Sequence, residues 1–70
     1  MKYVVLPEKI GEKLRKLRGK RTQQEVAEEV GISQSALHMY ETGSRVPRDN
    51  VKIDLANFYK TSIEELFYTE

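Results

Sequence analysis

The stretch that most constrains this fold is residues 22–43, which is predicted to form two short helices joined by a tight turn. Thr22 is a candidate N-cap, and Glu25 three positions later completes a capping box, a common helix start. The first helix is therefore predicted over about 22–30. Gly31 follows it, and glycine readily adopts the left-handed backbone of a helix C-cap.

A second helix is predicted over about 33–41, with Ser33 as its N-cap candidate. At about 100° per residue, its side chains fall on two different faces. The inward face is apolar and consists of Ala36, Leu37 and Tyr40. The outward face is polar, rich in amide and hydroxyl groups and almost uncharged, and it consists of Gln34, Ser35, His38 and Met39. This composition is unusual for a face that is merely solvated.

Four blocks of residues resemble the helix-turn-helix of the lambda-repressor-like, Cro/C1-type (XRE family) DNA-binding domains. The blocks are T-Q-x-E-V-A from Thr22, V-G-I-S from Val30, the inward face of the second helix, and E-x-G-x-R-x-P from Glu41. They occur in order and at family spacing, and the resemblance covers roughly Ile10 to Phe67. It implies an all-α fold, a compact five-helix DNA-binding domain over residues 8–70.

Three further helices flank this pair. The first is predicted from Glu8 to Arg18, where Ile10, Leu14 and Leu17 form an apolar stripe. Another is predicted over about 49–59, and a last short helix opens at a Ser62–Glu65 capping box. The family usually has an apolar residue where Lys52 stands and a glycine where Lys60 stands, so the register and the end of helix 49–59 are open.

Residues 1–7 form a β-prone N-terminal arm that the resemblance does not explain. Three interpretations compete: a strand pairing across a homodimer, an arm that touches DNA through Lys2, or a tail packed on its own domain. We favour a partly ordered arm or a short strand.

The formal net charge is +1, but the charge is unevenly distributed. Residues 1–21 carry a net charge of +6, residues 22–47 carry −3 and residues 48–70 carry −2. Phosphate affinity depends on local charge, so the N-terminal cluster fits a nucleic-acid partner. The simpler interpretation is that its outer lysines lie on a solvated helix face.

The residues of an active site are not apparent. The chain has one histidine and no cysteine, and no catalytic triad or glycine-rich phosphate loop can be assembled. We therefore expect a protein that is not an enzyme and that needs no cofactor and no metal. No apolar stretch is long enough to cross a membrane and no signal peptide is visible, so a cytoplasmic location is expected.

The base-contacting candidates lie on and beside the outward face of the second helix, which would enter the major groove. Gln34 is the leading candidate, because a side-chain amide pairs with adenine N6 and N7. Met39 is placed to press on a thymine methyl group. The full set is Gln34, Ser35, Met39, His38 and Ser33. For His38 and Met39 the alternative is simple exposure to solvent.

The phosphate-contacting candidates flank that helix. Gln23 begins the preceding helix, where backbone N–H groups and the helix dipole favour an anion. The loop after the second helix offers backbone amides and a cation. The full set is Thr22, Gln23, Lys20, Arg21, Gly43, Ser44 and Arg45. The resemblance further implies that Gln23 braces Gln34, and that Arg18 and Glu41 form a partly buried structural salt bridge.

The expected function is that of a sequence-specific DNA-binding transcriptional regulator, a repressor, that reads double-stranded DNA with helix 34–41. Operators of such domains are usually two-fold symmetric, so a homodimer is expected on DNA. Its contact surface is expected to include Phe58, Phe67 and Tyr68. The rival hypotheses are a protein-interaction module, such as an antitoxin or a partner-binding subunit, and a small RNA-binding or coactivator-like domain.

Overall fold

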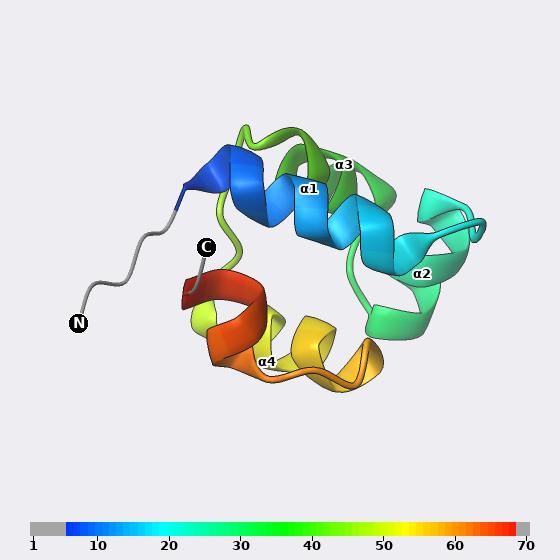
Figure 1. The fold of residues 1–70 in the computed structure, drawn as a ribbon. Coiled ribbons are helices and arrows are strands. Elements are labelled where there is room, and N and C mark those ends of the chain that lie inside the picture. Colours follow the sequence, from blue (N-terminus) through cyan, green and yellow to red (C-terminus); the bar gives the residue numbers. More distant parts are fainter. Residues whose placement is uncertain (1–5, 69–70) are drawn as a thin grey trace.

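The computed structural model describes residues 6–68 and contains five helices and no strand in that range (Figure 1). The hypotheses about residues 1–5 of the arm lie outside the described residues. The helices are α1 (Pro7–Arg18), α2 (Gln23–Val30), α3 (Gln34–Thr42), α4 (Asp49–Phe58) and a short π-helix, η1 (Glu64–Tyr68). The predicted all-α fold is therefore confirmed. α1 begins at Pro7, one residue before the predicted start, because proline suits the first turn of a helix.

The helix pair at the centre of the sequence argument begins and ends as its capping residues predict. The Thr22 hydroxyl accepts from the Glu25 backbone N–H at 3.0 Å, and the Glu25 carboxylate accepts from the Thr22 N–H at 2.8 Å. Gly31 ends α2 in the left-handed conformation, with φ of 89°. The Ser33 hydroxyl then accepts from the Ala36 N–H at 3.0 Å and starts α3.

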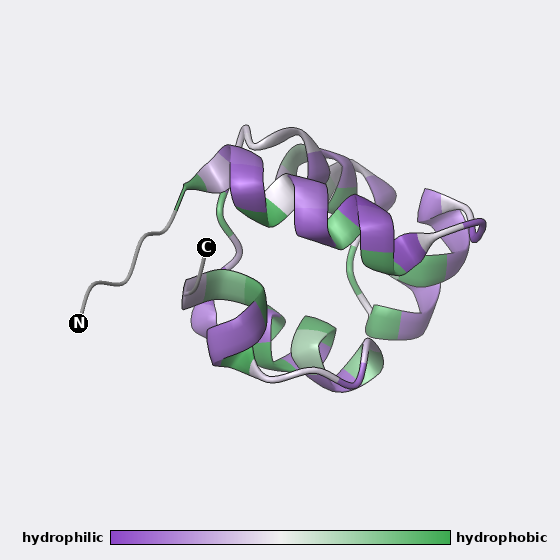
Figure 2. Cartoon of the chain, viewed as in Figure 1, coloured by the Kyte–Doolittle hydropathy of each residue, from purple (hydrophilic) through white to green (hydrophobic). Residues whose placement is uncertain are grey.

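The apolar faces of all five helices meet in one core (Figure 2). Its centre is occupied by side chains with almost no exposure, among which Leu14, Leu37, Leu55 and Phe67 are the largest. Val26 and Ala27 join them from α2. Each fully buried large side chain contributes about 1.5–3 kcal/mol of transfer free energy. This core fixes α2 and α3 against the rest of the domain.

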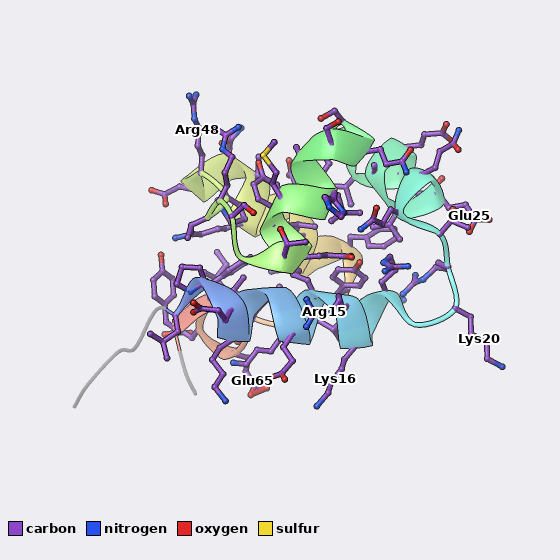
Figure 3. The ribbon with its side chains drawn as sticks, turned by 90° about the horizontal axis from the view of Figure 1, so that it is seen from above. Arg15, Lys16, Lys20, Glu25, Arg48 and Glu65 are labelled. Carbon is purple, nitrogen blue, oxygen red and sulfur yellow. The ribbon has the colours of Figure 1, made fainter. Side chains whose placement is uncertain are left out.

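α1 crosses close to the C-terminal end of α3 because Gly11 faces that end. A Cβ atom at Gly11 would lie 2.3 Å from the backbone oxygen of Glu41, closer than any normal contact. The Arg15 guanidinium donates to the same Glu41 oxygen, and Figure 3 labels Arg15 on α1. A residue without a side chain at position 11 is therefore required for the close approach of α1 to α3.

The two departures from the family pattern are accommodated in different ways. Lys52 is buried, and its ammonium group donates to the Tyr68 hydroxyl at 2.8 Å and lies 4.7 Å from the centre of the Tyr68 ring. Lys60 follows α4 with φ of 56°, a conformation that glycine adopts without strain. The lysine at position 52 thus packs where an apolar residue is usual, whereas Lys60 carries backbone strain.

Candidate nucleic-acid interface

The outward face of α3 and the first residue of α2 line one shallow hollow of about 450 Å³. Its lining side chains are Gln23, Gln34, Ser35, His38 and Met39. No aspartate, glutamate, lysine or arginine lines it, so it presents amide, hydroxyl, imidazole and thioether groups. These groups suit base edges, where hydrogen bonds and methyl contacts carry the sequence information.

The base-contacting candidates are brought together on this surface. Gln34, Ser35 and His38 are exposed, and Met39 is partly buried. Ser33 is exposed as well, but its hydroxyl oxygen already accepts the capping hydrogen bond from Ala36. Four of the five candidates therefore line the hollow, and Ser33 lies beside it as the N-cap of α3.

Behind this surface, Glu41 connects three helices although it is only 1% exposed. Its carboxylate accepts from Arg18 Nε at 2.8 Å and Arg18 Nη2 at 3.1 Å, both from α1. It also accepts from the Gln23 side-chain amide at 2.9 Å, which comes from α2. The Arg18–Glu41 pair expected from the resemblance is thus present. The hydrogen bond that Arg18 donates to Glu41 raises the pKa of Arg18 above its ordinary value.

The resemblance was wrong about the partner of Gln23. Its amide donates to Glu41 and lies 3.4 Å from His38 Nδ1, whereas no hydrogen bond joins it to Gln34 in the described residues. The geometric reason is the place where the Gln23 side chain, which comes from α2, lies against α3. The amide lies beside the turn that contains His38 and Glu41, one turn beyond Gln34.

Lys20 and Arg21, two of the phosphate candidates, lie in the link between α1 and α2 but are placed differently. Lys20 is exposed and extends away from the domain (Figure 3). The Arg21 guanidinium donates to the Leu17 carbonyl at 2.8 Å and lies 5.2 Å from the centre of the Phe58 ring. Arg21 therefore joins the end of α1 to α4, and Lys20 is the more available cation.

The loop after α3 uses its backbone amides internally. The N–H groups of Gly43, Ser44 and Arg45 donate to carbonyl groups of Met39 and Tyr40 at the end of α3. These three amides are thus not available to phosphate oxygens, which removes the reason for including Gly43. The Arg45 side chain is exposed, and the Ser44 hydroxyl pairs with that of Thr42 at 2.9 Å.

Tyr59, a residue that the sequence analysis did not single out, lies near the charged side chains of Arg18 and Glu41. Its hydroxyl is buried and has no hydrogen-bond partner in the described part of the chain. Burial, and then the negative charge of Glu41, raises the pKa of Tyr59. No sequence pattern indicated that this hydroxyl would be buried without a partner.

The surface expected for dimerisation needs one correction. Phe67 is 1% exposed and belongs to the core, so it cannot offer apolar surface to a second subunit. Phe58 and Tyr68 are partly exposed. The short π-helix turns Phe67 into the core that all five helices share.

Comparison with solved structures gives close matches over most of the chain. The restriction-modification controller protein C.AhdI from Aeromonas hydrophila is 28% identical, covers 87% of this chain and 96% of its own, and superposes with a TM-score of 0.78. The BldD DNA-binding domain of S. venezulae is 26% identical, with coverages of 89% and 96% and a TM-score of 0.73. The SOS-response transcriptional repressor LexA from Eubacterium rectale is 21% identical, with coverages of 93% and 71% and a TM-score of 0.84, and shows the shared fold.

No curated protein matches the chain significantly in sequence. None of the helices in residues 6–68 is long and apolar enough to cross a membrane. The family model HTH_3, described as Helix-turn-helix, matches residues 12–66, which is most of the chain. The family and the structural neighbours support a DNA-binding transcriptional regulator. The chain belongs to the Cro/C1-type (XRE) helix-turn-helix family.

Proposed function

We propose that this domain is a sequence-specific repressor that binds operator DNA by placing α3 in the major groove. The observation that carries the proposal is the uncharged polar hollow formed by Gln23, Gln34, Ser35, His38 and Met39. On α3 the side chains of Gln34, Ser35 and His38 are exposed and Met39 is partly buried beside them, whereas Leu37 and Tyr40 are buried in the core. Direct readout of bases requires this arrangement, because the groups that contact base edges must face outward.

The phosphate contacts are assigned to groups at the two ends of the helix pair. Gln23 and Lys20 lie at the start of α2, where the helix dipole favours an anion. Arg45 and Ser44 lie after α3 with exposed side chains. Thr22 and Arg21 are weaker candidates, because the first is held in its capping box and the second is held at the end of α1.

A homodimer on a two-fold symmetric operator completes the proposal. A single α3 spans about 14 Å, which covers only about half a turn of DNA, so two copies would give a longer and more selective site. Sedimentation of the protein alone and with operator DNA checks this part. A strict monomer under both conditions would remove it.

The experiment that tests the readout is a salt titration of binding to a selected operator and to a scrambled duplex. The operator comes first from selection of bound DNA out of a random pool. Gln34→Ala should lose about 1–3 kcal/mol on the operator and little on scrambled DNA. Arg45→Ala should weaken binding to both and reduce the salt slope by about one unit. Met39→Ala should lose less binding free energy on the operator than Gln34→Ala, and its effect should appear mostly at a thymine position.

If Gln34→Ala weakens both duplexes equally, α3 does not read bases and the protein-interaction hypothesis becomes the better one. The repressor assignment is checked separately. A reporter gene placed behind the selected operator should be transcribed less when the protein is expressed, and increased transcription would show an activator instead.

A further inference from the structure

The side chain of Gln23 connects a buried carboxylate to an exposed histidine. Its Nε2 atom lies 2.9 Å from Glu41 Oε1 and 3.4 Å from His38 Nδ1. Glu41 is 1% exposed and is held by two hydrogen bonds from Arg18. These side chains therefore form a hydrogen-bonded series that runs from the interior to the hollow proposed to face DNA.

The chemistry of these groups assigns the direction of each hydrogen bond in the series. An ionised carboxylate only accepts, so the group of Gln23 that faces Glu41 must be the NH₂ and not the carbonyl. One NH₂ proton is donated to Glu41, and the other is directed at His38. His38 Nδ1 must then be an acceptor, which leaves the proton of the neutral ring on Nε2.

We propose that His38 is a specificity-determining residue, held by Gln23 and Glu41 as the Nε2–H tautomer so that it offers DNA a hydrogen-bond donor. The inference rests on the proposed function, because it assigns a chemistry to one residue of that surface. Guanine offers the acceptors N7 and O6 in the major groove, whereas cytosine offers the N4 donor. His38 is thus expected to favour guanine and to reject cytosine at the base it meets.

Gln23 is a positioning residue in this account. A histidine ring without a fixed neighbour can exchange tautomers or rotate and so present either a donor or an acceptor. The Gln23 amide removes that freedom, because its NH₂ is itself fixed by Glu41. Removing the Gln23 side chain should therefore change which base His38 prefers.

The test uses duplexes in which each base pair of the selected operator is varied in turn to the other three. Wild-type protein should bind guanine about tenfold more tightly than cytosine at one position, the size of one good base contact. His38→Ala should lose that preference, and Gln23→Ala should lose it at the same position. The double variant should lose no more of it than either single variant.

Two further variants serve as controls. Gln24→Ala removes the neighbouring glutamine of α2, whose amide contacts Glu28, and should leave all preferences unchanged. His38→Gln places an amide that both donates and accepts near the same point, so it should keep affinity but lose the preference for guanine over cytosine. His38→Ala removes only an exposed side chain, so the fold should remain intact.

A result in which Gln23→Ala weakens all duplexes equally and keeps the preference of His38 overturns the inference and leaves the proposed function standing. Wild-type protein that binds every duplex equally overturns both the inference and the proposed function. Nitrogen-15 NMR of the histidine ring in the free protein gives a readout that needs no DNA. The expected neutral ring carries its proton on Nε2, and a ring protonated on Nδ1 overturns the inference directly.

Discussion

Substituting alanine for Gly11 tests whether the crossing of α1 and α3 is as tight as the structure shows. The new Cβ would lie 2.3 Å from the Glu41 backbone oxygen and 2.8 Å from its carbonyl carbon. Ordinary contact begins at 3.4 Å, so the helices must separate by about 1 Å. Both atoms belong to the backbone, so no side chain can rotate away to make room.

The magnitude follows from three effects. Overpacking a well-packed site costs about 1–3 kcal/mol, and the backbone contact here places the cost at the upper end. Moving the Glu41 oxygen also weakens its hydrogen bond from Arg15, which is worth about 0.5–1.5 kcal/mol. Against these effects, alanine in a helix is favoured over glycine by about 1 kcal/mol. The net expectation is a destabilisation of about 2–3 kcal/mol.

Urea denaturation followed by circular dichroism measures this difference as a shift in midpoint at unchanged slope. The control is Lys16→Ala, an exposed position further along α1, which should change stability by less than about 0.5 kcal/mol. A Gly11→Ala protein as stable as the wild type, or more stable as helix propensity alone predicts, would refute the close packing. DNA affinity should fall with stability, because the same contact positions the end of α3.

Three further predictions concern buried polar groups and backbone strain. Arg18→Met should cost about 2–4 kcal/mol in a thermal melt, and adding Glu41→Leu should recover part of the loss, because no unpaired buried carboxylate then remains. Tyr59→Phe should raise stability by about 1 kcal/mol, since it removes a buried hydroxyl without a partner. The pKa of Tyr59 is raised in the folded state, so ionisation of this residue above about pH 10 lowers the free energy of unfolding. Phenylalanine cannot ionise, so the variant should resist alkaline unfolding better in a pH titration. Lys60→Gly should gain up to about 1 kcal/mol by relieving a positive φ, whereas Lys60→Ala should gain nothing if the charge is irrelevant.

The helices that could be predicted were those whose signals are local. Thr22 and Ser33 start α2 and α3 because a hydroxyl three residues before an N–H forms a cap wherever the chain becomes helical. Gly31 ends α2 for an equally local reason. The apolar faces predicted for α1 and α3 also reach the core, where Ile10, Leu14, Leu37 and Tyr40 are buried. The burial of Phe67 was missed, because it depends on how η1 turns after Ser62.

The features that escaped prediction depend on two helices meeting. The importance of Gly11 cannot be read from α1 alone, because a glycine inside a helix ordinarily only weakens it. Lys52 looked out of place until the structure placed the Tyr68 hydroxyl and ring beside its ammonium group. In both cases the partner lies far away in sequence, and no spacing rule connects the two positions.

The candidate interface shows the same limit at the level of single hydrogen bonds. Its residue types and their face of α3 followed from helical periodicity, and the structure gathers four of the five base-contacting candidates around one hollow. The pairing within it did not follow, because Gln23 can reach Gln34, His38 or Glu41 depending on a shift of one turn along α3. Glu41 decides the matter: a buried carboxylate requires donors, and the Gln23 amide is the one that α2 supplies. The demand of the interior for hydrogen bonds therefore orients a side chain on the surface that we propose to meet DNA.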